Sequence, residues 1–138
     1  MRDNDQRPTQ HTGGCLCGGV RYQVRGPLRD VIACHCSQCR RTSGHYVAAA
    51  SAATEDLTFD SDATLAWYVS SSAAERGFCN FCGSNLFWRP TSPEAHTTSI
   101  MAGTLDLPTG LRTIGHIFVA DKGDYYDITD GVPQSAAW

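Results

Sequence analysis

The sequence lacks an apolar run long enough to cross a membrane, and its first ten residues, MRDNDQRPTQ, lack the apolar stretch that a signal peptide needs. An excess of positive charge is absent too, since the formal net charge of the 138 residues is -3. General attraction to phosphate backbones or anionic lipid is therefore not expected, and we predict neither a nucleic acid nor a membrane as partner. The expected location is the cytoplasm.

Runs with helical period are also scarce, and short alternating segments separated by turn residues dominate. Strands are predicted in GVRYQVR, TLAWYVS, ERGFC, SNLFWRP, HTTSIMAG and GHIFVAD. The one predicted helical turn lies in SQCRRTSG, with Ser37 as its N-cap. The sequence therefore predicts a mostly β single domain over residues 12–138, with long loops and little helix, preceded by a flexible segment, residues 1–11.

Cysteine, in contrast, is abundant. The seven cysteines cannot all pair with one another, and in a reducing compartment clustered thiols are more often metal ligands or catalytic groups than disulfides. Four of them form two short clips, here called the tetrad: Cys15 and Cys17 in CLC, and Cys79 and Cys82 in CNFC. The other three, here called the triplet, lie in CHCSQC: Cys34, Cys36 and Cys39. Thiolates at such spacings suit zinc.

The tetrad supplies enough thiols for one closed four-sulfur zinc site, which is the structural type. Tetrahedral geometry puts neighbouring sulfurs roughly 4 Å apart, whereas alternate side chains of a flat strand lie about 6.6 Å apart. The chain must therefore bend at each clip, and Gly18 and Gly83, which directly follow the two clips, permit such bends. The alternative is that these four residues are ordinary buried thiols.

The triplet supplies three ligands and leaves a fourth position open, which is the catalytic type of zinc site. Several alternatives remain at this point. The site could be closed by a fourth protein ligand, such as His35, His45 or His116. The thiols could also form a metal-free cluster or a redox pair, and a four-cysteine iron site is a further option for the ligand set.

The blocks GGCLCGGVRY, CHCSQCRRTSG and ERGFCNFCGSNLFW resemble, in order, spacing and flanking residues, the signature blocks of the glutathione-dependent formaldehyde-activating enzyme family, also called the centromere protein V/GFA domain. The resemblance runs from about Gly14 to Pro133. It implies a zinc-stabilised β-tent fold and two zinc ions per chain, a structural one in the tetrad and a catalytic, more labile one in the triplet. Tyr125 and Tyr126 stand where the family leads us to expect a tryptophan, so the shape of the pocket does not follow from the resemblance.

The resemblance also implies a carbon–sulfur lyase of the S-(hydroxymethyl)glutathione synthase type. Its substrates would be glutathione, or another thiol, and a small aldehyde such as formaldehyde. His35 and His45 are the nearest titratable candidates for proton transfer. Arg40 and Arg41 are candidates for binding the carboxylates of glutathione, with a solvated or fold-bracing pair as the alternative. A non-catalytic zinc-stabilised binding module is the alternative function, but the termini carry no basic patch that would favour it.

Overall fold

A computed structural model describes residues 8–138 of the chain. Within this range the strands are β1 (Gln10–Gly14), β2 (Val20–Arg25), β3 (Arg29–Cys34), β4 (Val47–Ala53), β5 (Leu57–Asp62), β6 (Leu65–Val69), β7 (Ala74–Cys79), β8 (Asn85–Pro90), β9 (Thr97–Met101) and β10 (Thr113–Ile117). The helical elements are α1 (Ser37–Ser43) and the short 3-10 turns η2 (Thr54–Asp56), η3 (Ala102–Thr104) and η4 (Val119–Asp121). The mostly β fold with little helix is thereby confirmed.

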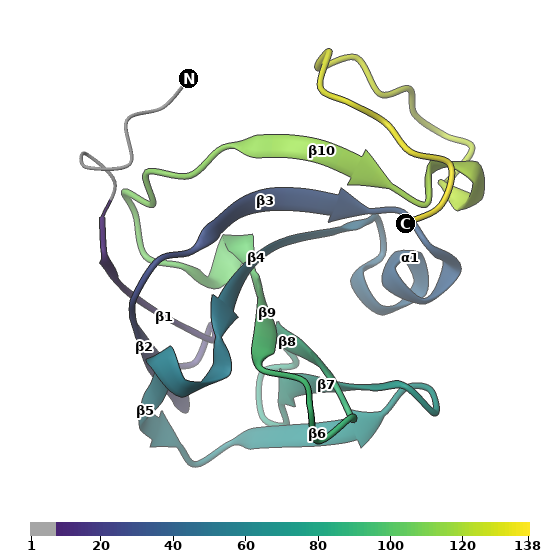
Figure 1. The fold of residues 1–138 in the computed structure, drawn as a ribbon. Helices are drawn as coiled ribbons and strands as arrows, with labels where there is room; N and C mark the ends of the chain where they lie inside the picture. The colour runs from purple at the N-terminus through teal and green to yellow at the C-terminus, as the bar shows by residue number, and fades with distance from the viewer. Residues whose placement is uncertain (1–7) are drawn as a thin grey trace.

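The strands form two sheets. A three-stranded sheet has the order β1-β2-β5, and a seven-stranded sheet has the order β10-β3-β4-β9-β8-β7-β6. All pairs are antiparallel except β10 with β3. In Figure 1 the larger sheet changes direction between β4 and β9, so that β10, β3 and β4 cross the upper part and β8, β7 and β6 the lower part.

Alternation along the strands gives the larger sheet two different faces. Phe87 and Ile100 are fully buried in a core shared with the small sheet, where the ring of Phe87 meets Tyr22 edge-on at 5.3 Å between centroids. Their neighbours in sequence, Trp88 and Ser99, point to the opposite face and line a pocket there. One face of the sheet therefore holds the fold together, and the other face is available for a site.

The six segments that were predicted to be strands overlap β2, β6, β7, β8, β9 and β10, with β7 and β10 beginning before the predicted segments. In GHIFVAD the strand covers less than expected, because Phe118 adopts a left-handed conformation with φ of 54° and ends β10 at Ile117. The predicted cap of the helix was wrong. The N-cap of α1 is Cys36, which has extended backbone angles and accepts a hydrogen bond from the backbone N–H of Cys39 at 3.4 Å.

The amino-terminal boundary also differs from the expected one. β1 begins at Gln10, inside the segment 1–11 that was predicted to be flexible, and His11 is buried with Nε2 at 2.9 Å from the carbonyl oxygen of Thr109. Residues 1–7 lie outside the described residues. No helix of the described part of the chain is long and apolar enough to span a bilayer. Location in the cytoplasm remains a prediction.

Candidate metal centres and substrate pocket

The two clips of the tetrad are matching turns that face each other. Backbone N–H groups point at the sulfurs in both: Val20 donates to Cys15 Sγ at 3.2 Å and Cys82 donates to Cys79 Sγ at 3.3 Å. Gly18 and Gly83 have φ of +83° and +80°, the left-handed conformation that the two bends were expected to need. Cys15 and Cys17 come from the turn between β1 and β2, whereas Cys79 is the last residue of β7 and Cys82 lies in the turn between β7 and β8.

The four sulfurs of the tetrad fit a zinc ion. All of them lie within 4.8 Å of one another. Cys17 Sγ is 3.6 Å from both Cys15 Sγ and Cys79 Sγ, close to the roughly 4 Å that tetrahedral zinc–thiolate geometry requires. Hydrogen bonds from the side chain and backbone of Ser84 lower the pKa of the Cys82 thiol to about 5, which favours the thiolate form that binds metal. Thiolates with these separations could hold zinc, in agreement with the expectation from the sequence.

The triplet is a local structure at the junction of β3 and α1. Cys34 is the last residue of β3, Cys36 caps α1, and Cys39 lies buried in its first turn. The three sulfurs also lie within 4.8 Å of one another and could hold a metal ion. The group contains no fourth His, Cys, Asp or Glu among the described residues. A metal held here would have three protein ligands.

Hydrogen bonds within the triplet and from Arg76 stabilise a thiolate at Cys39. The interaction with Cys34, followed by those with Cys36 and with the guanidinium of Arg76, outweighs burial and lowers the pKa of Cys39 to about 6. The same interaction with Cys39 raises the pKa of Cys34. Arg76 Nη2 lies 3.7 Å from Cys39 Sγ. The thiol that lies deepest in the group is therefore also the one whose thiolate is most stabilised.

His35, although it stands between two ligands of the triplet in sequence, faces away from the pocket. It is 1% exposed, and its Nε2 shares a hydrogen bond of 2.9 Å with Nδ1 of His116. Its Nδ1 is bonded to the hydroxyl of Tyr126. His116 Nε2 donates to Asp130 Oδ2 at 2.8 Å, so a chain of hydrogen bonds runs from this carboxylate through both imidazole rings to the tyrosine hydroxyl. Burial, followed by repulsion from His116, lowers the pKa of His35 to about 4.

This chain of hydrogen bonds disfavours closure of the triplet by a histidine. Both ring nitrogens of His35 and of His116 are already engaged with other partners. His45 is exposed, and its Nδ1 lies 2.6 Å from the hydroxyl of Tyr125. Tyr125 and Tyr126, the pair that departs from the family pattern, thus connect the carboxyl-terminal segment to the loop that carries the triplet.

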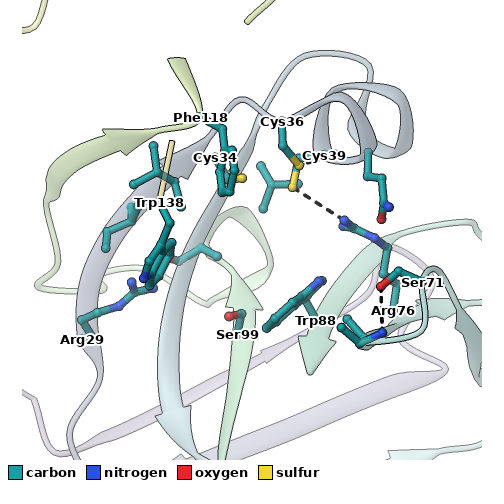
Figure 2. A pocket seen from close by; sticks show the side chains of 17 residues that line it. Arg29, Cys34, Cys36, Cys39, Ser71, Arg76, Trp88, Ser99, Phe118 and Trp138 are labelled. Atoms are coloured by element: carbon teal, nitrogen blue, oxygen red, sulfur yellow. Dashed lines mark hydrogen bonds between the residues drawn. The ribbon is translucent and has the colours of Figure 1, made fainter. Parts of the chain in front are cut away.

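A pocket with a cavity volume of about 500 Å³ opens beside the triplet. Figure 2 shows Cys34, Cys36 and Cys39 at its upper edge, Trp88 and Ser99 below them, and Arg29 and Arg76 on opposite sides. Trp138, Phe118 and Ser71 complete the labelled part of the wall. All three thiols of the triplet line the pocket. A small molecule bound in the pocket could therefore occupy the coordination position that the three thiols would leave open on a metal.

The structure brings some of the predicted site residues to this pocket and not others. The triplet lines it, whereas Arg40, Arg41, His35 and His45 do not. Roles for these four in substrate binding or proton transfer remain predictions. The two arginines that do line the pocket, Arg29 and Arg76, were missed. Alternation along β7 could have revealed Arg76, but a register shift between Gly77 and Phe78 breaks the pattern.

The fold and these two thiol groups define a class, a small β protein with a four-thiol group that could hold a metal and a three-thiol group that opens onto a pocket. A family model described as "Glutathione-dependent formaldehyde-activating enzyme" matches residues 10–121, and the chain belongs to this family.

Similar proteins include the following two. A Schizosaccharomyces pombe protein named as an uncharacterized lyase is 26% identical over 121 residues, which cover 88% of this chain and 87% of that protein. A crystal structure of a Rhodobacter sphaeroides protein has a TM-score of 0.58 and 24% identity, with 89% of this chain and 98% of the other covered. The second similarity concerns the fold alone.

Proposed function

We propose that this chain is a zinc-dependent carbon–sulfur lyase that forms or cleaves the S-hydroxymethyl-type adduct of a thiol and a small aldehyde. Glutathione is the thiol and formaldehyde the aldehyde that the family suggests. The name of the S. pombe relative is consistent with a lyase. The observation that carries the proposal is the triplet itself, in which three thiols line a pocket and no fourth protein ligand accompanies them among residues 8–138.

Cys34, Cys36 and Cys39 would hold the zinc, which when bound lowers the pKa of a thiol in its open position and so supplies thiolate at neutral pH. Three thiolates around Zn²⁺ give a net charge of about -1 on a simple count of charges. The positive charge of Arg76 beside Cys39 offsets the further negative charge of an incoming thiolate. The triplet and Arg76 thus act together to hold the nucleophile.

The proposed reaction forms one carbon–sulfur bond and transfers one proton to oxygen. The thiolate sulfur of the substrate adds to the aldehyde carbon, the carbon–sulfur bond forms, and the carbonyl electron pair moves to oxygen, which takes up a proton to become a hydroxyl. Cleavage is the reverse. Because neither His35 nor His45 lines the pocket, water in the pocket carries this proton in the present proposal, and direct transfer by either histidine remains a separate prediction.

Exchange NMR tests the proposal. Free formaldehyde and its glutathione adduct interconvert without a catalyst, so the measured quantity is the exchange rate with and without zinc-loaded protein. We expect the protein to accelerate exchange and the variant Cys36→Ser, which lacks one ligand of the triplet, to lose the acceleration. Exchange at the uncatalysed rate, together with no binding of glutathione by calorimetry, would contradict the proposal and favour a non-catalytic binding module.

A further inference from the structure

Arg76 is a buried cation with unused hydrogen-bond donors. Its side chain is 3% exposed, yet Nε and Nη1 have no partner among the described residues, and Nη2 alone contacts Cys39 Sγ. The carboxylate of the neighbouring residue, Glu75, pairs with Arg89 at 2.6 Å instead of with Arg76. Figure 2 shows the guanidinium of Arg76 directed toward the thiols of the triplet. Buried charged donors without partners are costly, so a ligand that fills them gains affinity.

Arg29 repeats this pattern on the other side of the pocket. It lies at the start of β3, its Nη2 donates to the carbonyl oxygen of Ala49 at 3.0 Å, and its Nε is buried without a partner in the described part of the chain. Burial lowers its pKa, but the normal value is so high that the group stays protonated at neutral pH. Figure 2 places Arg29 and Arg76 on opposite sides of the cavity, with the triplet above and between them.

The charge of the lining also points to an anion. The residues that line the pocket include these two arginines and no Asp or Glu, in a chain with a net charge of -3. Between the two guanidinium groups the wall is aromatic, with Trp88 and Trp138. Neutralisation of the triplet explains at most one donor of Arg76, and it explains nothing about Arg29. A guanidinium with free donors at a pocket wall is suited to a bidentate contact with a carboxylate.

We propose that Arg76 and Arg29 are specificity-determining residues that bind two carboxylates of the thiol substrate, Arg76 beside the triplet and Arg29 across the pocket. This inference rests on the proposed function for the position of the sulfur. It selects a substrate class, a thiol that carries a carboxylate on each side of its sulfur, and it discriminates against neutral and cationic thiols.

Calorimetry with zinc-loaded protein tests the inference with glutathione and its diethyl ester, which keeps the thiol and loses both carboxylate charges. Each lost charge-assisted contact is expected to cost about tenfold in affinity. The wild-type protein should therefore bind glutathione about a hundredfold more tightly than the ester. In Arg29→Met this ratio should fall to about tenfold, and Arg29→Lys should restore part of it. Equal affinities for the acid and the ester in the wild-type protein would overturn the inference.

Two variants serve as further checks. Arg76→Met should reduce the same ratio, with the zinc content measured alongside. If that variant loses the triplet zinc, the decision rests on Arg29→Met, because Arg29 donates to the carbonyl oxygen of Ala49 and is not one of the groups that would hold the metal. Arg21→Met is the matched control, since Arg21 pairs with Asp106 at the surface, away from the pocket. A ratio that is unchanged in Arg29→Met, or equally reduced in Arg21→Met, would contradict the inference.

S-methylglutathione separates failure of the inference from failure of the proposed function, because it keeps both carboxylates and cannot supply a thiolate. It should bind more weakly than glutathione but with the same dependence on Arg29. Equal binding of glutathione and S-methylglutathione, with that dependence intact, would support recognition by the arginines and contradict thiol ligation at the triplet. No measurable binding of either ligand would contradict both.

Discussion

The tetrad and the triplet are both built from cysteine side chains, but they differ in the number of thiols and in their surroundings. The tetrad joins a turn of the three-stranded sheet to a turn of the seven-stranded sheet and gathers four thiols. The triplet gathers three thiols within one short stretch and faces a pocket with two arginines. By the number of ligands and the length of chain between them, a metal in the tetrad would hold the fold together, whereas a metal in the triplet would be open to chemistry.

The largest effect should come from removing a ligand of the tetrad. In Cys82→Ser the metal can no longer tie the turn between β7 and β8 to the turn between β1 and β2, and its binding energy is folding energy. We expect several kcal/mol of lost stability out of the roughly 5–15 kcal/mol that a domain has, and therefore insoluble or strongly destabilised protein. Thermal melting measures this. A Cys82→Ser protein with wild-type melting would contradict a structural role for the tetrad.

Removal of a triplet ligand should spare the fold. Cys34 and Cys39 are so close in sequence that their metal closes only a short loop and constrains little of the chain. We expect Cys36→Ser to be soluble, to melt near the wild-type temperature, to hold one zinc per chain instead of two, and to lose thiol binding. Metal analysis and melting on the same samples decide the matter. Unfolding as severe as that of Cys82→Ser would make the triplet a structural site.

A chelator should distinguish the two sites without any mutation. A metal with an open position is easier to extract than one enclosed by four thiolates, so zinc should leave the wild-type protein in two phases, first from the triplet and then from the tetrad. The released zinc can be followed with a chromogenic chelator. Glutathione at saturation should slow the first phase only. Release in a single phase, or protection of the slow phase by glutathione, would contradict the assignment.

A smaller effect is expected from the histidines behind the triplet. In His116→Phe the Nε2 of buried His35 loses its partner, which should cost about 1–3 kcal/mol in the free energy of unfolding. In His45→Phe the lost contact with Tyr125 is exposed, so the cost should stay below about 0.5 kcal/mol. Urea unfolding of the two variants gives the comparison. Equal costs would indicate that the buried chain does not support the loop that carries the triplet.

The sequence predicted the parts of the site that depend on local spacing. Short cysteine spacings identify both clips and the triplet, and a count of ligands alone assigns Cys15 and Cys79 to one group although they lie on different sheets. The strands whose apolar residues alternate, such as β2, were also predicted. β4, with the sequence VAAASAA, was missed, because alanine has a low strand propensity and this segment is a strand by virtue of its pairing with β3 and β9.

The pocket could not be predicted in the same way, because its walls come from strands that are distant in sequence. Arg29 and Arg76 meet the same cavity only through the order of strands in the large sheet. Arg40 and Arg41 were chosen because they follow the triplet directly; on α1 they do not line this pocket, and their role in substrate binding remains a prediction. Proximity in sequence identified the two clips and the triplet, since each is a local turn, and did not identify the arginines that line the pocket.

The most direct test of the account is a crystal structure of the zinc-loaded protein with bound glutathione. The account predicts a metal in each thiol group, with the sulfur of glutathione about 2.3 Å from the metal of the triplet as its fourth ligand. It would be contradicted by a triplet metal whose fourth ligand is a protein side chain, or by glutathione bound with its sulfur remote from Cys34, Cys36 and Cys39.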